Sequence, residues 1–225
     1  MNNTLLIPQQ SQNHSIDASI QETINSMIED LIVSLPNPNQ LTSDERRGII
    51  ARYSAVLEGN FIYWMTATLI SVQSEDARPI LLDNLREEVR DAHPVMLRRF
   101  AIGANSFPTD HDALAVDEDL TNVRRFLGKL SGIQSVLTMA FFEGFIQRFM
   151  GYLASLATAQ GSTEMEYTDV HGVCDIAHTD GLFRALSAEM AVSSIEEGQD
   201  LFEGVYLLRN LIETIVFNRT EARAA

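Results

Sequence analysis

The sequence has little cysteine, proline and lysine. Its 225 residues include one cysteine, six prolines and one lysine, Lys129, so nearly all of its basic residues are arginine. One cysteine cannot form a disulfide within the chain, and a Cys-based zinc ribbon needs several thiolates. The composition therefore excludes a disulfide-stabilised scaffold and a zinc ribbon.

Positive charge is also scarce. The 16 basic residues face 31 acidic ones, which gives a formal net charge of −15. A field of this sign repels phosphate backbones and anionic lipids, so we expect no nucleic-acid or membrane partner. The most apolar long segment, residues 136–157, still contains Glu143, Gln147 and Arg148, which disfavours a membrane span. The first residues lack the basic and apolar regions of a secretory signal, so we expect a cytoplasmic protein.

Apolar residues recur at helical spacing along nearly the whole chain. Their share of 45% suits one domain with a sizeable core, and we expect a flexible segment at 1–15 followed by a single domain at 16–225. Thr42 and Glu45 have the spacing of a capping box at the start of a long helix that reaches about Val72. Residues 103–116 are expected to form a loop, and later helices are expected at about 117–129, 132–159, 165–190 and 194–217. The pattern predicts an all-α bundle of about seven helices.

Three side chains that commonly bind metals share one helix in the sequence His171-x3-Asp175-x2-His178. At 3.6 residues per turn, Asp175 lies about 40° and His178 about 20° from His171 around the helix axis. Two imidazoles and a carboxylate on one stripe are what a facial metal site needs. The alternative is a polar helix face on which the histidines have no joint role.

Glu143 lies within the large apolar residues of Leu137 to Ile146. Burial of a lone carboxylate is costly unless the group is paired or binds a metal ion. The sequence therefore leaves two interpretations: a metal ligand, or a structural ion pair with Arg148 or Arg124.

A third cluster of such residues precedes Pro94. His93 lies at the helix break that this proline predicts, where its ring can turn inward. Glu88 is about 1.4 turns earlier and needs the break in order to converge with His93. Glu87, Glu88 and Asp91 can equally form a solvated face with nearby arginines.

Together these residues resemble a known family. The sequence Leu82-Asp83-Asn84-Leu85-x-x-Glu88 and the later His93, Glu143 and His171-x3-Asp175-x2-His178 look like the CADD-like group of haem-oxygenase-like di-metal oxidases. The resemblance implies a seven-helix, haem-oxygenase-like bundle with a non-haem di-iron centre. Carried over by position, it implies six ligands: Glu88, His93, Glu143, His171, Asp175 and His178.

The resemblance also implies a function. Such a centre binds O2 after reduction and oxidises an amine, a carboxylic acid or a C–H bond of a small molecule, and Glu143 is the candidate bridge between two iron ions. Manganese or zinc could take the place of iron, because nitrogen and oxygen ligands select weakly among divalent metals. Haem is not expected, since the only early histidine, His14, lies outside the first apolar stripe. A homodimer is expected by analogy with the family.

The chain departs from the family pattern at two points. The gap from Glu88 to His93 is short, so Glu87 is a rival ligand. Where the chlamydial member has the lysine used in its self-consuming amination, this chain has Leu153, and its one lysine, Lys129, belongs to an earlier helix. We therefore expect the metal site without that reaction.

The remaining candidates have weaker support. Glu58 and Tyr53, on the long second helix, are candidates for residues that orient the ligands without binding the metal ion. Cys174 is interpreted as a packing residue on another face of its helix. Two other functions stay open. One is a non-redox manganese or zinc enzyme, and the other is an interaction protein that keeps the fold without catalysis.

Overall fold

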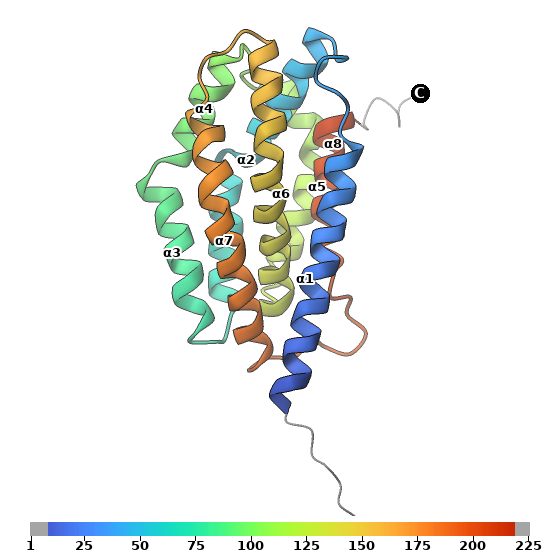
Figure 1. The fold of residues 1–225 in the computed structure, drawn as a ribbon, viewed down its shortest axis with the longest axis vertical. Coiled ribbons are helices and arrows are strands. Elements are labelled where there is room, and N and C mark those ends of the chain that lie inside the picture. The colour runs from blue at the N-terminus through green and yellow to red at the C-terminus, as the bar shows by residue number, and fades with distance from the viewer. Residues whose placement is uncertain (1–8, 219–225) are drawn as a thin grey trace, which may run out of the picture.

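The computed structural model describes residues 9–218, with side chains described from residue 18 onward. Over this range the chain forms helices and no strand (Figure 1), which confirms the predicted all-α class. The helices are α1 (Gln9–Ser34), α2 (Ser43–Ser71), α3 (Ala77–Arg90), α4 (His93–Gly103), α5 (Asp110–Leu127), α6 (Gly132–Ala159), α7 (Glu166–Met190) and α8 (Glu203–Phe217). None of these described helices combines the length and apolar character needed to cross a lipid bilayer.

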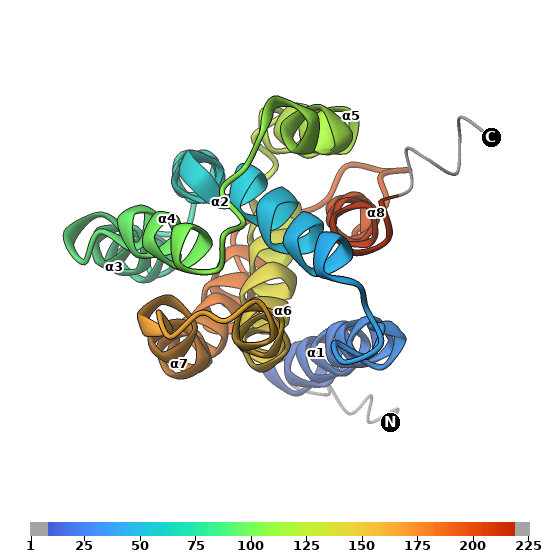
Figure 2. The same ribbon diagram turned by 90° about the horizontal axis from the view of Figure 1, so that it is seen from above.

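Helix α6 forms the centre of the bundle. It packs against α1, α2, α7 and α8, and the view from above shows these helices around it (Figure 2). Four phenylalanines on it are buried: Phe141, Phe142, Phe145 and Phe149. A helix that is apolar on nearly every side is stable only when neighbours cover it, so α6 occupies the middle of the core. Glu143 is carried into that core with it.

Helix α2 has a capping box at its start and a kink in its middle. The Thr42 side chain accepts a hydrogen bond from the Glu45 backbone N–H, and the Glu45 carboxylate accepts one from Thr42, as the sequence predicted. The kink lies at Glu58 and Gly59, and Gly59 has φ of +83°. Glycine adopts this conformation readily because it has no Cβ. The sequence predicted an unbroken helix here, because a single glycine is tolerated in helices.

Three other helix boundaries differ from those expected. Helix α5 begins at Asp110, inside the predicted loop 103–116, because Thr109 and Asp112 form a capping box that Arg47 reinforces by pairing with Asp112. Helix α8 begins at Glu203, about nine residues later than expected. Helix α1 begins at Gln9, within the segment expected to be flexible, and residues 1–8 lie outside the described part. The side chain of His14 is also outside it.

The junction of α3 and α4 is a sharp turn rather than a continuous helix. Helix α3 ends at Arg90, and Ala92 has the left-handed conformation with φ of 54°. Pro94 occupies the first turn of α4, where a missing backbone N–H costs nothing. This turn changes the chain direction between Glu88 and His93.

Candidate metal centre

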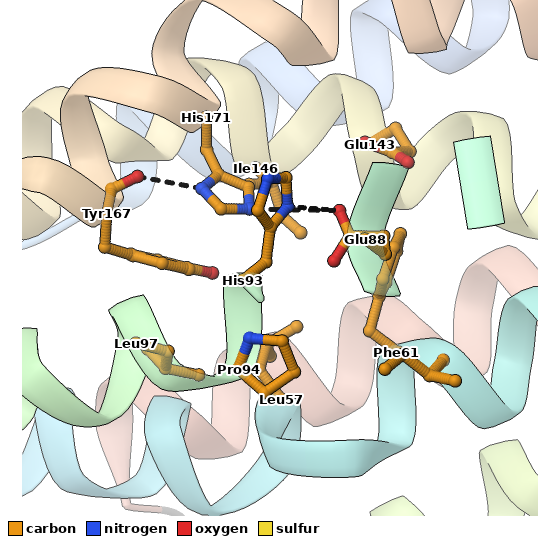
Figure 3. A pocket seen from close by; sticks show the side chains of 11 residues that line it. Leu57, Phe61, Glu88, His93, Pro94, Leu97, Glu143, Ile146, Tyr167 and His171 are labelled. Atoms are coloured by element: carbon orange, nitrogen blue, oxygen red, sulfur yellow. Dashed lines mark hydrogen bonds and ion pairs between the residues drawn. The ribbon is translucent and has the colours of Figure 1, made fainter. Parts of the chain in front are cut away.

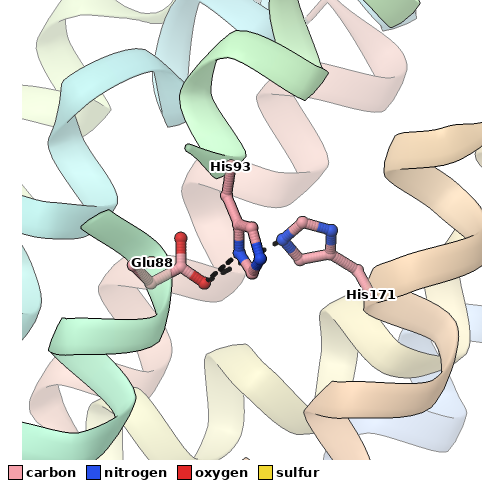
Figure 4. A group of neighbouring side chains, drawn as sticks. All are labelled: Glu88, His93 and His171. Carbon is pink, nitrogen blue, oxygen red and sulfur yellow. Dashed lines mark hydrogen bonds and ion pairs between the residues drawn. The ribbon is translucent and has the colours of Figure 1, made fainter. Parts of the chain in front are cut away.

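Glu88, His93 and His171 converge from three helices. Figure 4 shows the carboxylate of α3 facing the imidazole of α4, with the imidazole of α7 beside it. The distance between Glu88 Oε1 and His93 Nδ1 is 2.8 Å, and that between Glu88 Oε1 and His171 Nε2 is 3.9 Å. All three residues are buried. One ligand atom from each lies within 4.8 Å of the others, which is close enough for one ion to contact all three.

The sharp α3–α4 turn brings Glu88 and His93 together. A straight helix would place the two side chains on different faces, because five residues correspond to about 1.4 turns. The left-handed Ala92 changes the direction of the chain between α3 and α4, and both side chains are buried in the bundle. The sequence predicted a break at this position from Pro94.

Asp175 and His178 form a second group one to two turns further along α7. The distance between His178 Nδ1 and Asp175 Oδ1 is 3.7 Å. Cys174 lies beside them, and its thiol donates a hydrogen bond to Asp175 Oδ1 across 3.2 Å. The sequence predicted that Cys174 packs on another face of its helix, but its sulfur lies within 4.8 Å of ligand atoms from the other two residues.

Glu143 adjoins both groups. Its Oε1 atom is 3.7 Å from His178 Nδ1, and it lines the same cavity as Glu88, His93 and His171. Its hydrogen-bond donor is Asn84 Nδ2 on α3, at 2.8 Å. Arg148 instead bonds to Asn25, and Arg124 bonds to Asn60. Neither of the two arginines that were predicted as structural partners forms an ion pair with Glu143.

Burial and neighbouring charges oppose each other at these groups. Burial, followed by the negative charge of Glu143, raises the pKa of Asp175 to about 7. Burial lowers the pKa of His178, but Asp175, Glu143 and Glu87 outweigh it and raise that pKa to about 11. Burial and the nearby His93 lower the pKa of His171 to about 4. Three carboxylates and three imidazoles thus share a buried space in which no ion pair with an arginine or lysine is seen among the described residues.

Several buried polar atoms in the described residues lack a hydrogen-bond partner. They include Asp175 Oδ2 and His178 Nδ1, which belong to the second group, and Asn84 Oδ1 next to Glu143. A buried carboxylate or imidazole atom without a partner is costly, and a bound metal ion is one way to satisfy it. Carboxylate and imidazole donors suit iron, manganese and zinc. The residues present therefore fit a metal centre.

Glu87 and Glu88 point in different directions from α3. Glu88 faces His93 and His171, whereas Glu87 Oε2 lies 2.9 Å from His178 Nε2 at the edge of the bundle. The side chain of Glu87 is 43% exposed, and that of Glu88 is 6% exposed. The buried carboxylate is the better candidate ligand for the first group.

The two supporting candidates from α2 lie at different distances from the site. The Tyr53 hydroxyl shares a hydrogen bond of 2.8 Å with Tyr167, whose ring packs on His171. Burial raises the pKa of both tyrosines, so they stay neutral. Glu58 forms an ion pair with Arg98 on α4, and no described contact joins it to a candidate ligand. It therefore does not support a ligand histidine directly.

A small cavity lies against the first group (Figure 3). Its volume is roughly 20 Å³, which leaves room for about one water-sized molecule. Apolar side chains from α2, α4 and α6 form most of its wall, namely Leu57, Phe61, Ile62, Pro94, Leu97 and Ile146. No residue of the segment 103–116, where the sequence predicted a loop, lines this cavity.

A second, more polar cleft of about 260 Å³ lies between α3 and α7. Glu87, Cys174 and His178 are among its lining residues, together with Asp83 and Arg184. The candidate centre thus has an apolar cavity beside the first group and a polar cleft beside the second.

Two residues near the centre were assigned no function from the sequence. Asn84 lies one turn before Glu88, so both project from the same face of α3. The Tyr167 carbonyl accepts a hydrogen bond from His171 Nδ1 across 2.8 Å, one turn earlier on α7. Each of these residues lies four positions before a candidate ligand, and this spacing is the signal that could have identified Asn84 and Tyr167.

The fold and site define a class: a helical bundle with a buried cluster of carboxylates and histidines contributed by four helices. Comparison with known proteins gives the family. Residues 51–212 match the family model described as iron-containing redox enzyme, so the chain belongs to this haem-oxygenase-like family. No curated protein matches the chain significantly, and neither does any solved structure.

Proposed function

We propose that this protein is a non-haem di-iron oxidase or oxygenase of the CADD-like type that acts on a small metabolite. The observation that carries the proposal is the position of Glu143 between two groups of potential ligands. One ion is assigned to Glu88, His93 and His171, and the other to Asp175 and His178, with Glu143 shared. When bound, such a centre supplies the electrons that reduce O2 and the oxidising power that acts on the substrate.

The chain's own residues prepare the site for this chemistry. His171 donates its Nδ1 proton to the Tyr167 carbonyl, which leaves Nε2 directed toward Glu88. Because the tautomer of a ligand histidine is set by the hydrogen bond at its other nitrogen, this contact presents Nε2 to the ion. The apolar wall beside Glu88 and His93 limits water near the reacting centre.

Lysine-dependent self-modification is not part of the proposal. Leu153 is buried in the core, and Lys129 forms an ion pair with Glu203 at the surface. The substrate is therefore proposed to be a separate molecule. A cytoplasmic location and a homodimer also remain predictions from the sequence.

The test is anaerobic loading with Fe(II) followed by exposure to O2. We expect a transient visible absorption and no mass change in the protein. An intact protein that binds iron but shows no absorption change with O2 would contradict the oxidase assignment. A chain that gains or loses mass during the reaction would contradict the assignment of a separate substrate.

One observation favours a second candidate, a non-redox zinc enzyme. Cys174, Asp175 and His178 offer a sulfur, an oxygen and a nitrogen within 4.8 Å of one another, and zinc accepts such a set. Cobalt(II) substitution separates the candidates. A sulfur-to-cobalt charge-transfer band that disappears in Cys174→Ser would favour the zinc assignment, whereas a spectrum unchanged by Cys174→Ser favours the iron centre with nitrogen and oxygen ligands.

A further inference from the structure

We propose that Glu87 is a positioning residue that fixes the orientation of His178 and directs its Nδ1 atom toward the metal ion. This inference rests on the proposed metal centre. The two nitrogens of His178 have different surroundings. Nε2 lies 2.9 Å from Glu87 Oε2, whereas the buried Nδ1 has no hydrogen-bond partner. Nε2 is therefore placed to keep its proton once a metal ion displaces the proton from Nδ1.

The unpartnered nitrogen faces the other potential ligands. His178 Nδ1 lies 3.7 Å from Glu143 Oε1 and 3.7 Å from Asp175 Oδ1. These separations exceed a hydrogen bond but suit three atoms that surround one ion. A neutral imidazole has one N–H and one lone pair, so a proton held at Nε2 leaves the lone pair at Nδ1. Glu87 therefore selects the tautomer that the centre needs.

The position of Glu87 on α3 separates its role from that of Glu88. Adjacent residues on a helix are about 100° apart around its axis. The carboxylates of Glu87 and Glu88 therefore cannot both point at the same group of ligands. Glu88 turns into the bundle, and Glu87 reaches across the polar cleft to α7. Carboxylate–histidine–metal arrangements of this kind orient the ring and raise the basicity of the ligand.

His171 provides an internal comparison. Its Nδ1 donates a hydrogen bond to the Tyr167 carbonyl on the same helix, so the orientation of the His171 ring depends on α7 alone. The partner of His178 lies on α3, and the orientation of its ring therefore depends on the packing of α3 against α7. Loss of the Glu87 carboxylate should affect only the ion held by Asp175 and His178.

The experiment measures metal affinity in three variants of the full chain. Mn(II) binding is measured by competition with a chelator in wild type, Glu87→Ala, Glu87→Gln and Asp83→Asn. Asp83 is the matched control, because it lies one turn earlier on α3 and lines the same cleft, but forms an ion pair with Arg86. We expect Glu87→Ala to weaken one ion by about 10- to 100-fold and leave the other unchanged. Glu87→Gln keeps an acceptor and should recover part of this loss, and Asp83→Asn should match wild type.

The second readout is the nitrogen NMR spectrum of His178 in the Zn(II)-loaded and metal-free protein. We expect a proton on Nε2 in both forms, zinc on Nδ1, and a change in the Nε2–H resonance in Glu87→Ala. Zinc on Nε2 would overturn the proposal, as would equal weakening by Glu87→Ala and Asp83→Asn. Wild type that binds no ion would contradict the metal centre itself, and the change in the Nε2–H resonance between metal-free wild type and metal-free Glu87→Ala would then still decide whether Glu87 accepts a hydrogen bond from Nε2.

Discussion

His178 on α7 and Glu143 on α6 face each other in the core, with the imidazole Nδ1 atom 3.7 Å from the carboxylate Oε1 atom. Within the described part of the chain neither group pairs with an arginine, and Glu143 accepts its hydrogen bond from the neutral Asn84 side chain. A metal cation bound between Glu143, His178 and Asp175 would stabilise these buried groups, because it would contact their unpaired oxygen and nitrogen atoms.

Replacement of Glu143 by glutamine should separate metal binding from fold stability. The amide oxygen still accepts from Asn84 Nδ2, while the negative charge near Asp175 and Glu88 is removed. We expect the thermal midpoint of the metal-free protein to stay the same or rise, and iron affinity to fall by more than about 10-fold. Differential scanning calorimetry with and without Fe(II) measures both effects.

Glu75→Gln, at an exposed position, is the control and should change neither quantity. A structural ion pair at Glu143 would give the opposite pattern. In that case Glu143→Gln would destabilise the metal-free protein. Fe(II) would still raise the thermal midpoint of the variant nearly as much as it raises that of wild type.

Metal binding should release protons. The raised pKa of His178, about 11, means that its Nδ1 is protonated in the metal-free protein at pH 7, and Asp175, with a pKa of about 7, is partly protonated. A metal ion must displace these protons, so affinity should rise as pH rises from 6 to 8. Titration of the protein with Mn(II) in weakly buffered solution containing a pH indicator measures the release.

The release should be about one to two protons per chain at pH 7 in wild type and smaller in His178→Ala. Binding that is independent of pH, without proton release, would show that His178 does not give up a proton to the ion.

Filling the apolar cavity should slow the reaction without removing iron. Ile146 is buried and lines the cavity beside Glu143. In Ile146→Phe the larger ring occupies space near the first ion, so we expect iron content to be retained and O2 consumption to fall. Leu156→Phe is the control, since Leu156 is buried on the same helix but does not line the cavity. Both variants should lose about 1–3 kcal/mol of stability from overpacking. Equal O2 consumption in the two would contradict a role for the cavity.

The kink in α2 places Gly59 in a backbone conformation that other residues adopt only at a cost in stability. Gly59 has φ of +83°, and a Cβ atom added there would meet nothing within 4 Å. Gly59→Ala should therefore destabilise the protein by about 1–2 kcal/mol through backbone strain alone. Gly151→Ala is the matched control in open space within α6, where alanine should stabilise by roughly 0.5–1 kcal/mol. Urea denaturation measures both, and a neutral Gly59→Ala would contradict strain at the kink.

Local patterns in the sequence predicted much of the helical structure. The stripe of His171, Asp175 and His178 follows from helical periodicity, and all three are buried along α7. Pro94 predicted the break that brings His93 to Glu88. The start of α5 was missed because its capping box ends in Asp112, whereas the usual pattern has glutamate or glutamine at this position.

The convergence of separate helices could not be read from spacing. Periodicity shows which face Glu143 shares with its neighbours on α6, but its approach to His178 depends on how α6 packs against α7. The same limit applies to Glu87, whose role depends on a contact with a residue 91 positions later. Helical spacing places Cys174 on a different face from the ligands, and the contact between its thiol and Asp175 could not be read from that spacing.

The iron content of the anaerobically reconstituted protein is the most direct test of the proposed centre. Wild type should bind about two Fe(II) ions per chain, and Asp175→Asn should retain about one, because the group of Glu88, His93 and His171 stays intact. Iron near zero in wild type with all six residues present would contradict a di-iron centre. Complete loss of iron in a folded Asp175→Asn protein would contradict its division into two groups.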